Sequence, residues 1–75
     1  MNVAVIGVGH VGLVTAATMA KIGHNVIGFD IDESKIESLR TGVVPFHEPG
    51  LQELFVEGME AGRIRVTTEL SLIHI

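Results

Sequence analysis

The feature that most constrains this chain is a run of three glycines, spaced Gly7-x-Gly9-x-x-Gly12, directly after a short apolar segment. That segment, residues 3–6, is rich in β-branched side chains and is typical of a strand buried on both faces. Each glycine has its own steric reason: a tight turn, close approach of a ligand to the backbone, and close packing of a helix on the strand. Residues 13–22 are rich in Ala, Leu and Met and form the predicted helix.

The rest of the chain alternates between further strands and helices. Residues 26–29 predict a second buried strand, and residues 64–67 alternate in polarity like a more exposed third strand. Asp32 is placed to cap a short helix over 33–40. A later helix is indicated by apolar residues on one helical face: Leu51, Leu54, Phe55, Gly58 and Met59. The order β-α-β-α-α-β predicts an α/β fold with a parallel sheet, a partial Rossmann domain of about half the usual size.

An acidic residue follows the second strand. Asp30 lies 18 residues beyond Gly12, near the spacing of about 20 at which dinucleotide folds place the acid that binds the adenosine ribose. A carboxylate there would repel a 2′-phosphate and so favours NAD over NADP. The alternative is an Asp that ends the strand and caps the next helix. Lys35 could reach the adenosine side of a nucleotide, or be a surface lysine paired with an acid.

The glycine turn and the helix after it point free N–H groups and a positive dipole end at any bound phosphate. His10 lies inside this turn, so we expect it to line the phosphate site. The chain's histidines show no metal-ligand spacing, and no metal is expected. For His47 and Glu48 we favour a turn that begins a helix over a catalytic acid–base role.

Composition argues against several classes of function. The chain has 75 residues and no Cys, which excludes a disulfide framework, a Cys-based zinc site and a thiol nucleophile within it. The formal net charge is −4 and no basic cluster occurs, which argues against nucleic acid and against an anionic membrane surface as partners. The first residues lack the basic stretch of a secretory leader, and no apolar run reaches bilayer length, so we expect neither a leader nor a membrane span. We therefore expect a cytoplasmic protein.

Several separated motifs occur in the order found in one known family. They are the strand and glycine turn with Leu13-Val14-Thr15, Gly23-His24-x-Val26-x-Gly28-x-Asp30-Ile31-Asp32, Lys35-Ile36, Pro45-x-x-Glu48-Pro49-Gly50-Leu51, and Gly62 to Thr68. Over residues 1–69 the chain therefore resembles the UDP-glucose/GDP-mannose dehydrogenase family. The resemblance implies that these residues are the N-terminal part of an NAD-binding domain.

The resemblance also assigns residues to the cofactor. It implies that Val11 contacts NAD, that Asp30 holds the ribose and that Lys35 contacts the adenosine half. The full expected set of cofactor-binding residues is Gly7, Val8, Gly9, His10, Val11, Gly12, Asp30 and Lys35. One departure is His10, because the family commonly has tyrosine at that position.

The implied parent enzyme is a UDP-glucose 6-dehydrogenase-like oxidoreductase of polysaccharide biosynthesis, with NAD and a nucleotide sugar as ligands and a homo-oligomeric state. Such enzymes oxidise the C6 alcohol of a UDP- or GDP-hexose to the uronate with two NAD, and the second oxidation needs a thiol. In the family the catalytic residues and the substrate domain lie beyond residue 75, so this chain alone is expected to be inactive.

Two alternatives to this function remain open. One is a stand-alone nucleotide-binding module without catalysis. The other is a fragment of another Rossmann dehydrogenase, such as a 3-hydroxyacid dehydrogenase, which Glu48-Pro49-Gly50-Leu51 and the segment 62–68 disfavour.

The last six residues depart from the family pattern. Leu70-Ser71-Leu72-Ile73-His74-Ile75 can be written as the codons CTG TCT CTT ATA CAC ATC, the transposon mosaic-end sequence of library adapters. We therefore expect residues 70–75 to be a non-native tail. The alternative is the natural start of a strand or helix.

Overall fold

The computed structural model describes residues 1–69 and residue 71, and it confirms the predicted order β-α-β-α-α-β. The elements are β1 (Asn2–Ile6), α1 (His10–Lys21), β2 (Asn25–Phe29), α2 (Glu33–Arg40), α3 (Leu51–Glu60) and β3 (Ile64–Thr67). Apart from residue 71, the expected non-native tail at 70–75 lies outside the described residues.

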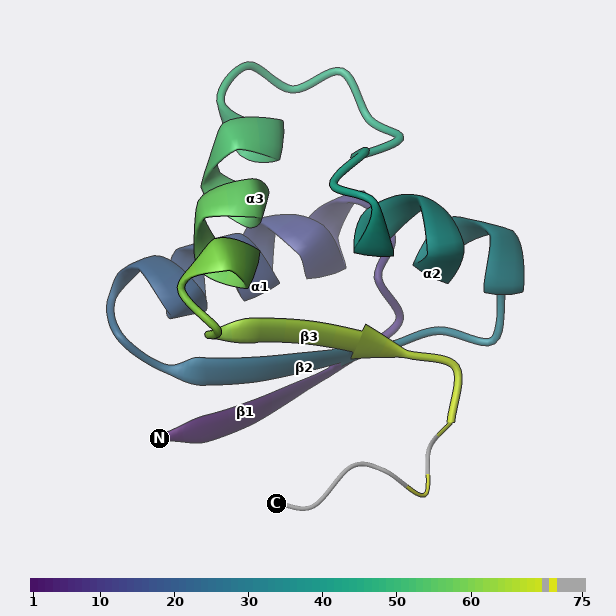
Figure 1. Cartoon of the computed structure of the whole chain (residues 1–75), viewed down its shortest axis with the longest axis horizontal. Helices are drawn as coiled ribbons and strands as arrows, with labels where there is room; N and C mark the ends of the chain where they lie inside the picture. Colours follow the sequence, from purple (N-terminus) through teal and green to yellow (C-terminus); the bar gives the residue numbers. More distant parts are fainter. Residues whose placement is uncertain (70, 72–75) are drawn as a thin grey trace.

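The three strands form one parallel sheet in the order β1-β2-β3, with β2 in the middle. Val3 lies opposite Val26, which in turn lies opposite Ile64. All three helices lie on the same face of this sheet (Figure 1). This arrangement is the one expected when successive right-handed crossovers advance in one direction across a sheet.

The one-sided helix layer overturns two expectations about burial. The first strand is not buried on both faces, because Val5 faces the helices while Ile6 is 63% exposed. The third strand, expected to be more exposed, is mostly buried: Ile64, Val66 and Thr67 are covered and only Arg65 is exposed. Burial of a strand depends on which layer covers it, and a residue pattern alone does not reveal that layer.

The glycine turn overlaps the first helix. Helix α1 begins at His10, three residues earlier than predicted, because the carbonyl of Gly9 already accepts the N–H of Leu13 at 2.9 Å. Gly12 therefore lies inside the first turn of α1, where an added Cβ would stand 2.1 Å from the carbonyl oxygen of Gly7. Gly7 itself has φ +92°, in the left-handed region. Both confirm the predicted steric roles: Gly7 permits the turn and Gly12 permits close packing.

The core lies between the helices and the sheet. Its largest fully buried side chains are Phe55, Leu13, Ile36, Leu39 and Val8. Ile36 and Leu39 on α2 therefore point into the core, and the predicted apolar stripe of α3 packs against it, which confirms both predictions. The described helices include none that is long and apolar enough to cross a membrane.

Substituting Gly12 by Ala is expected to lower the free energy of unfolding by about 1–3 kcal/mol, since the new methyl group meets backbone rather than a movable side chain. Gly9→Ala is the matched control, because nothing lies within 4 Å of a Cβ at Gly9. Urea denaturation of both variants checks this. Equal losses in the two variants would contradict the steric argument.

The 75-residue chain is expected to self-associate. Among the described residues no strand pairs with the outer edge of β1. Ile6 follows the core residue Val5 in the strand and is exposed on the opposite face of the sheet. Ile6→Lys is expected to reduce association, measured by sedimentation at increasing concentration. The control Ile22→Lys, at an exposed apolar position beyond α1, is expected to change it little. A monomer that melts cooperatively at high concentration would refute this expectation.

Candidate functional site

The expected cofactor residues gather at the carboxyl edge of the sheet. The glycine turn leaves β1 there, and Asp30 follows the last residue of β2. The N–H of Gly7 donates to the carbonyl of Phe29 at 2.7 Å, so the turn and the end of β2 are joined directly. In open α/β sheets this edge is the place where ligands bind.

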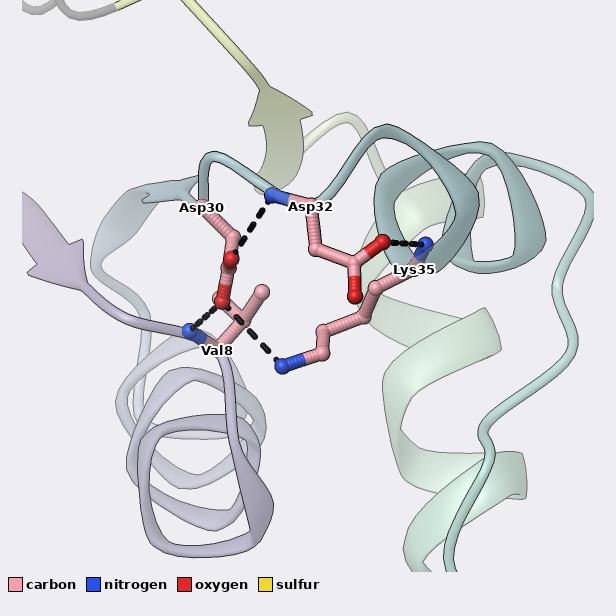
Figure 2. Close-up of polar contacts among 4 residues, drawn as sticks. All are labelled: Val8, Asp30, Asp32 and Lys35. Atoms are coloured by element: carbon pink, nitrogen blue, oxygen red, sulfur yellow. Dashed lines mark hydrogen bonds and ion pairs between the residues drawn. The ribbon is translucent and has the colours of Figure 1, made fainter.

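The carboxylate of Asp30 accepts hydrogen bonds from two backbone N–H groups and one side-chain ammonium (Figure 2). Its Oδ2 accepts the N–H of Val8 and the ammonium of Lys35, each at 3.2 Å, while Oδ1 accepts the N–H of Asp32 at 2.9 Å. The helix cap is a different residue, since Asp32 accepts the N–H of Lys35 at 3.1 Å. The alternative in which Asp30 caps the next helix is therefore wrong.

These donors hold the pKa of the Asp30 carboxyl below its ordinary value of 3.8. The N–H of Asp32 makes the largest contribution; Lys35 and the N–H of Val8 add to it, while burial acts in the opposite direction. Asp30 is therefore ionised at neutral pH, although its side chain is only 14% exposed. A partly buried, fixed carboxylate at this edge is an acceptor for hydroxyl groups.

The start of α1 offers unused backbone donors. The first N–H groups of a helix have no acceptor within the helix, and the N-cap Gly9 has no side chain to bind them. No acidic residue lies in the first turn, and the space beside Gly9 is open. The side chain of Val11 is 80% exposed. These features fit a polyphosphate approaching the backbone.

Val8 is placed differently from the other expected cofactor residues. Its side chain is fully buried and its N–H is engaged by Asp30. What Val8 can do is position the turn, because neither its side chain nor its N–H faces outward.

His10 makes contacts that sequence reasoning did not find. Its Nε2 pairs with the carboxylate of Glu48, and its ring stacks on Phe46 with centroids 5.4 Å apart and planes 25° apart. The side chains of His10 and Glu48 are both about half exposed. No local pattern could have indicated the pairing, because 38 residues separate the partners. Glu48 thus holds the loop before α3 against the start of α1.

Within residues 1–69 and 71, no three His, Asp or Glu side chains gather as metal ligands would. His24 lies in the turn after α1 and His47 is exposed in the loop before α3. Within the part of the chain that the structure describes, neither histidine is hydrogen-bonded to Asp30.

Comparison with known proteins adds a family match. The family model of the UDP-glucose/GDP-mannose dehydrogenase family, NAD binding domain, matches residues 1–73. The UDP-glucose 6-dehydrogenase YwqF of Bacillus subtilis is 47% identical over 68 residues, which are 91% of this chain and 16% of that protein. The GDP-mannose 6-dehydrogenase of Azotobacter vinelandii is 42% identical over 71 residues, again 16% of its length.

Solved structures agree with these relatives. A ternary complex of GDP-mannose dehydrogenase from Pseudomonas aeruginosa superposes with a TM-score of 0.88 at 39% identity, over 92% of this chain and 16% of that one. The UDP-D-ManNAc dehydrogenase of Pyrococcus horikoshii gives a TM-score of 0.91 at 34% identity, over 95% and 17%. The chain thus spans about a sixth of the proteins that it matches.

Asp30→Asn is expected to make the free energy of unfolding depend less on pH in the acid range. A depressed folded-state pKa contributes stability above the unfolded value, and this contribution is lost as pH falls through the folded value. The stability gap between the parent chain and the variant should therefore narrow as pH falls below 3.8. Urea midpoints from about pH 6 to about pH 2.5 measure the gap. Glu60→Gln, at the exposed end of α3, controls for the loss of one carboxylate; a constant gap for Asp30→Asn would contradict the argument.

Proposed function

Since this chain belongs to the UDP-glucose/GDP-mannose dehydrogenase family and matches its NAD-binding domain, we propose which of its residues bind each part of NAD. In the turn from Gly7 to Gly12, the backbone from Gly9 onward holds the pyrophosphate, and His10 and Val11 flank it. Gly7 and Val8 position this backbone, because their N–H groups donate to Phe29 and Asp30. Asp30 accepts the hydroxyl groups of the adenosine ribose, and Lys35 lies beside the adenosine half. Residues 1–69 form the N-terminal part of this domain, and residues 70–75 are a non-native tail.

One observation carries this assignment. An ionised carboxylate, Asp30, is hydrogen-bonded to the N–H of Val8 within the glycine turn. The ribose acceptor and the phosphate-facing backbone are therefore held in one rigid arrangement before any ligand arrives. Preorganisation of this kind supports dinucleotide binding because the site loses little further entropy when it is occupied.

NAD, when bound, supplies the acceptor for a hydride. The residues proposed here bind and orient its adenosine and pyrophosphate end, away from the reacting ring. The oxygen of a ribose hydroxyl would lie against Asp30, and the open space at Gly9 would admit the phosphates. None of these residues touches the reacting atoms, so none is proposed to be catalytic.

For the whole protein we propose a nucleotide-sugar dehydrogenase that acts in polysaccharide biosynthesis, is homo-oligomeric and is cytoplasmic. It oxidises the C6 alcohol of a UDP- or GDP-linked hexose to the carboxylate with two NAD. The similarity to enzymes named for UDP-glucose and for GDP-mannose supports the substrate class. The 75 residues contain no Cys, so this chain by itself lacks a thiol for the second oxidation and is expected to be inactive.

ADP-ribose tests the assignment, because it carries the adenosine and pyrophosphate that these residues are proposed to bind and lacks the reacting nicotinamide ring. Calorimetric titration should show saturable binding, and Gly9→Ala should weaken it about tenfold or more by filling the space beside the backbone. The unfolding free energy of Gly9→Ala, measured in parallel, separates lost binding from lost fold. With NAD and UDP-glucose present, the chain alone should form no NADH. Undiminished binding by Gly9→Ala would reject the phosphate assignment.

A further inference from the structure

Lys35 is positioned against the acid that is proposed to bind the ribose. Its ammonium lies 3.2 Å from Oδ2 of Asp30, and the two side chains are 26% and 14% exposed. Figure 2 shows the Lys35 side chain reaching back from α2 toward the carboxylate. This pair is better shielded than the pair of Lys21 with Glu57, whose side chains are 58% and 65% exposed.

The contacts of Asp30 leave little room for ribose. A carboxylate has about four lone-pair sites, and Oδ2 already accepts two donors while Oδ1 accepts one. Of these three donors, the two N–H groups are fixed in the backbone, whereas the ammonium of Lys35 is carried on a flexible stem. A ribose that takes both oxygens of Asp30 therefore displaces Lys35, whose cation then lies beside the ribose hydroxyls.

The charge of Lys35 also changes what the acid can exclude. Asp30 alone would repel a 2′-phosphate on the ribose, whereas an ammonium 3.2 Å away offsets that repulsion and is itself a phosphate ligand. The other cation of α2, Arg40, is directed elsewhere, since it donates to the carbonyl of Val66 and pairs with Glu37. Repulsion or attraction of a 2′-phosphate at this position therefore depends on Asp30 and Lys35.

We propose that Lys35 sets the discrimination between a ribose with a free 2′-hydroxyl and one with a 2′-phosphate. Lys35 is a phosphate-binding cation, and its ion pair with Asp30 limits its affinity for the phosphate. The inference rests on the proposed function of this edge. It predicts that removing Lys35 sharpens the preference for the unphosphorylated ribose. It also predicts that removing the charge of Asp30 releases Lys35 to bind the phosphate.

The test compares two probes, ADP-ribose and 2′-phospho-ADP-ribose, in each variant of this chain. The measured quantity is the dissociation constant of the phosphorylated probe divided by that of ADP-ribose. Only folded molecules bind, and the folded fraction scales both constants equally, so the ratio is insensitive to partial unfolding. Lys35→Met should raise the ratio against the phosphorylated probe about tenfold. Asp30→Ser should lower this ratio about tenfold or more. In the double variant, which also carries Lys35→Met, the ratio should no longer be lowered.

Two controls keep the result interpretable. Asp30→Asn removes the charge but retains an oxygen for the N–H of Val8 or Asp32, so it repeats the test with less disturbance of the turn. Lys21→Met removes one cation from the far end of α1 and should leave the ratio unchanged.

The outcomes separate this inference from the function on which it rests. If the parent chain binds neither probe, the proposed function and this inference both fall. If it binds ADP-ribose, but Lys35→Met leaves the ratio unchanged and neither substitution of Asp30 gains affinity for the phosphorylated probe, this inference alone is overturned.

Discussion

The contact between Gly12 and the carbonyl of Gly7 is the constraint from which the rest of the arrangement follows. A Cβ at Gly12 would stand 2.1 Å from that oxygen, so α1 reaches its position over β1 only because no side chain intervenes. That position brings Ala16, Ala17 and Ala20 against the core and turns the first N–H groups of α1 toward the carboxyl edge of the sheet. Fold and candidate site therefore depend on the same close approach.

Steric demands of this kind were readable from the residues alone. The tight turn at Gly7, the close packing at Gly12 and the cap at Asp32 follow from the sequence, because each depends on a suitable residue at a fixed offset. The apolar stripe of α3 was readable for a similar reason, since helical periodicity places Leu51 and Phe55 on one face. Together these local rules were enough to predict the order of elements and the parallel sheet.

Properties that depend on distant segments were not readable. The exposure of Ile6 and the burial of Ile64 and Val66 differ from the predictions because every helix lies on one face of the sheet (Figure 1). The sequence predicts that the first helix begins at residue 13, whereas α1 begins at His10 because the last residues of the glycine turn are already helical. In the site, the sequence predicts Asp30 at the carboxyl edge and allows the pairing of Lys35 with an acid. The hydrogen bond to Asp30 from the N–H of Val8, 22 residues away, depends on three-dimensional geometry.

The loop between α2 and α3 is fastened at several points along its length. The ring of His10 stacks on Phe46 and pairs with Glu48, and the N–H of Val44 donates to Gln52 at 3.1 Å. Its backbone freedom is therefore lost when the chain folds and not when a ligand arrives. If a dinucleotide binds at the start of α1 as proposed, it meets a surface that is already ordered. Its association is then expected to proceed at a rate governed by diffusion and orientation, without a slower step of loop closure.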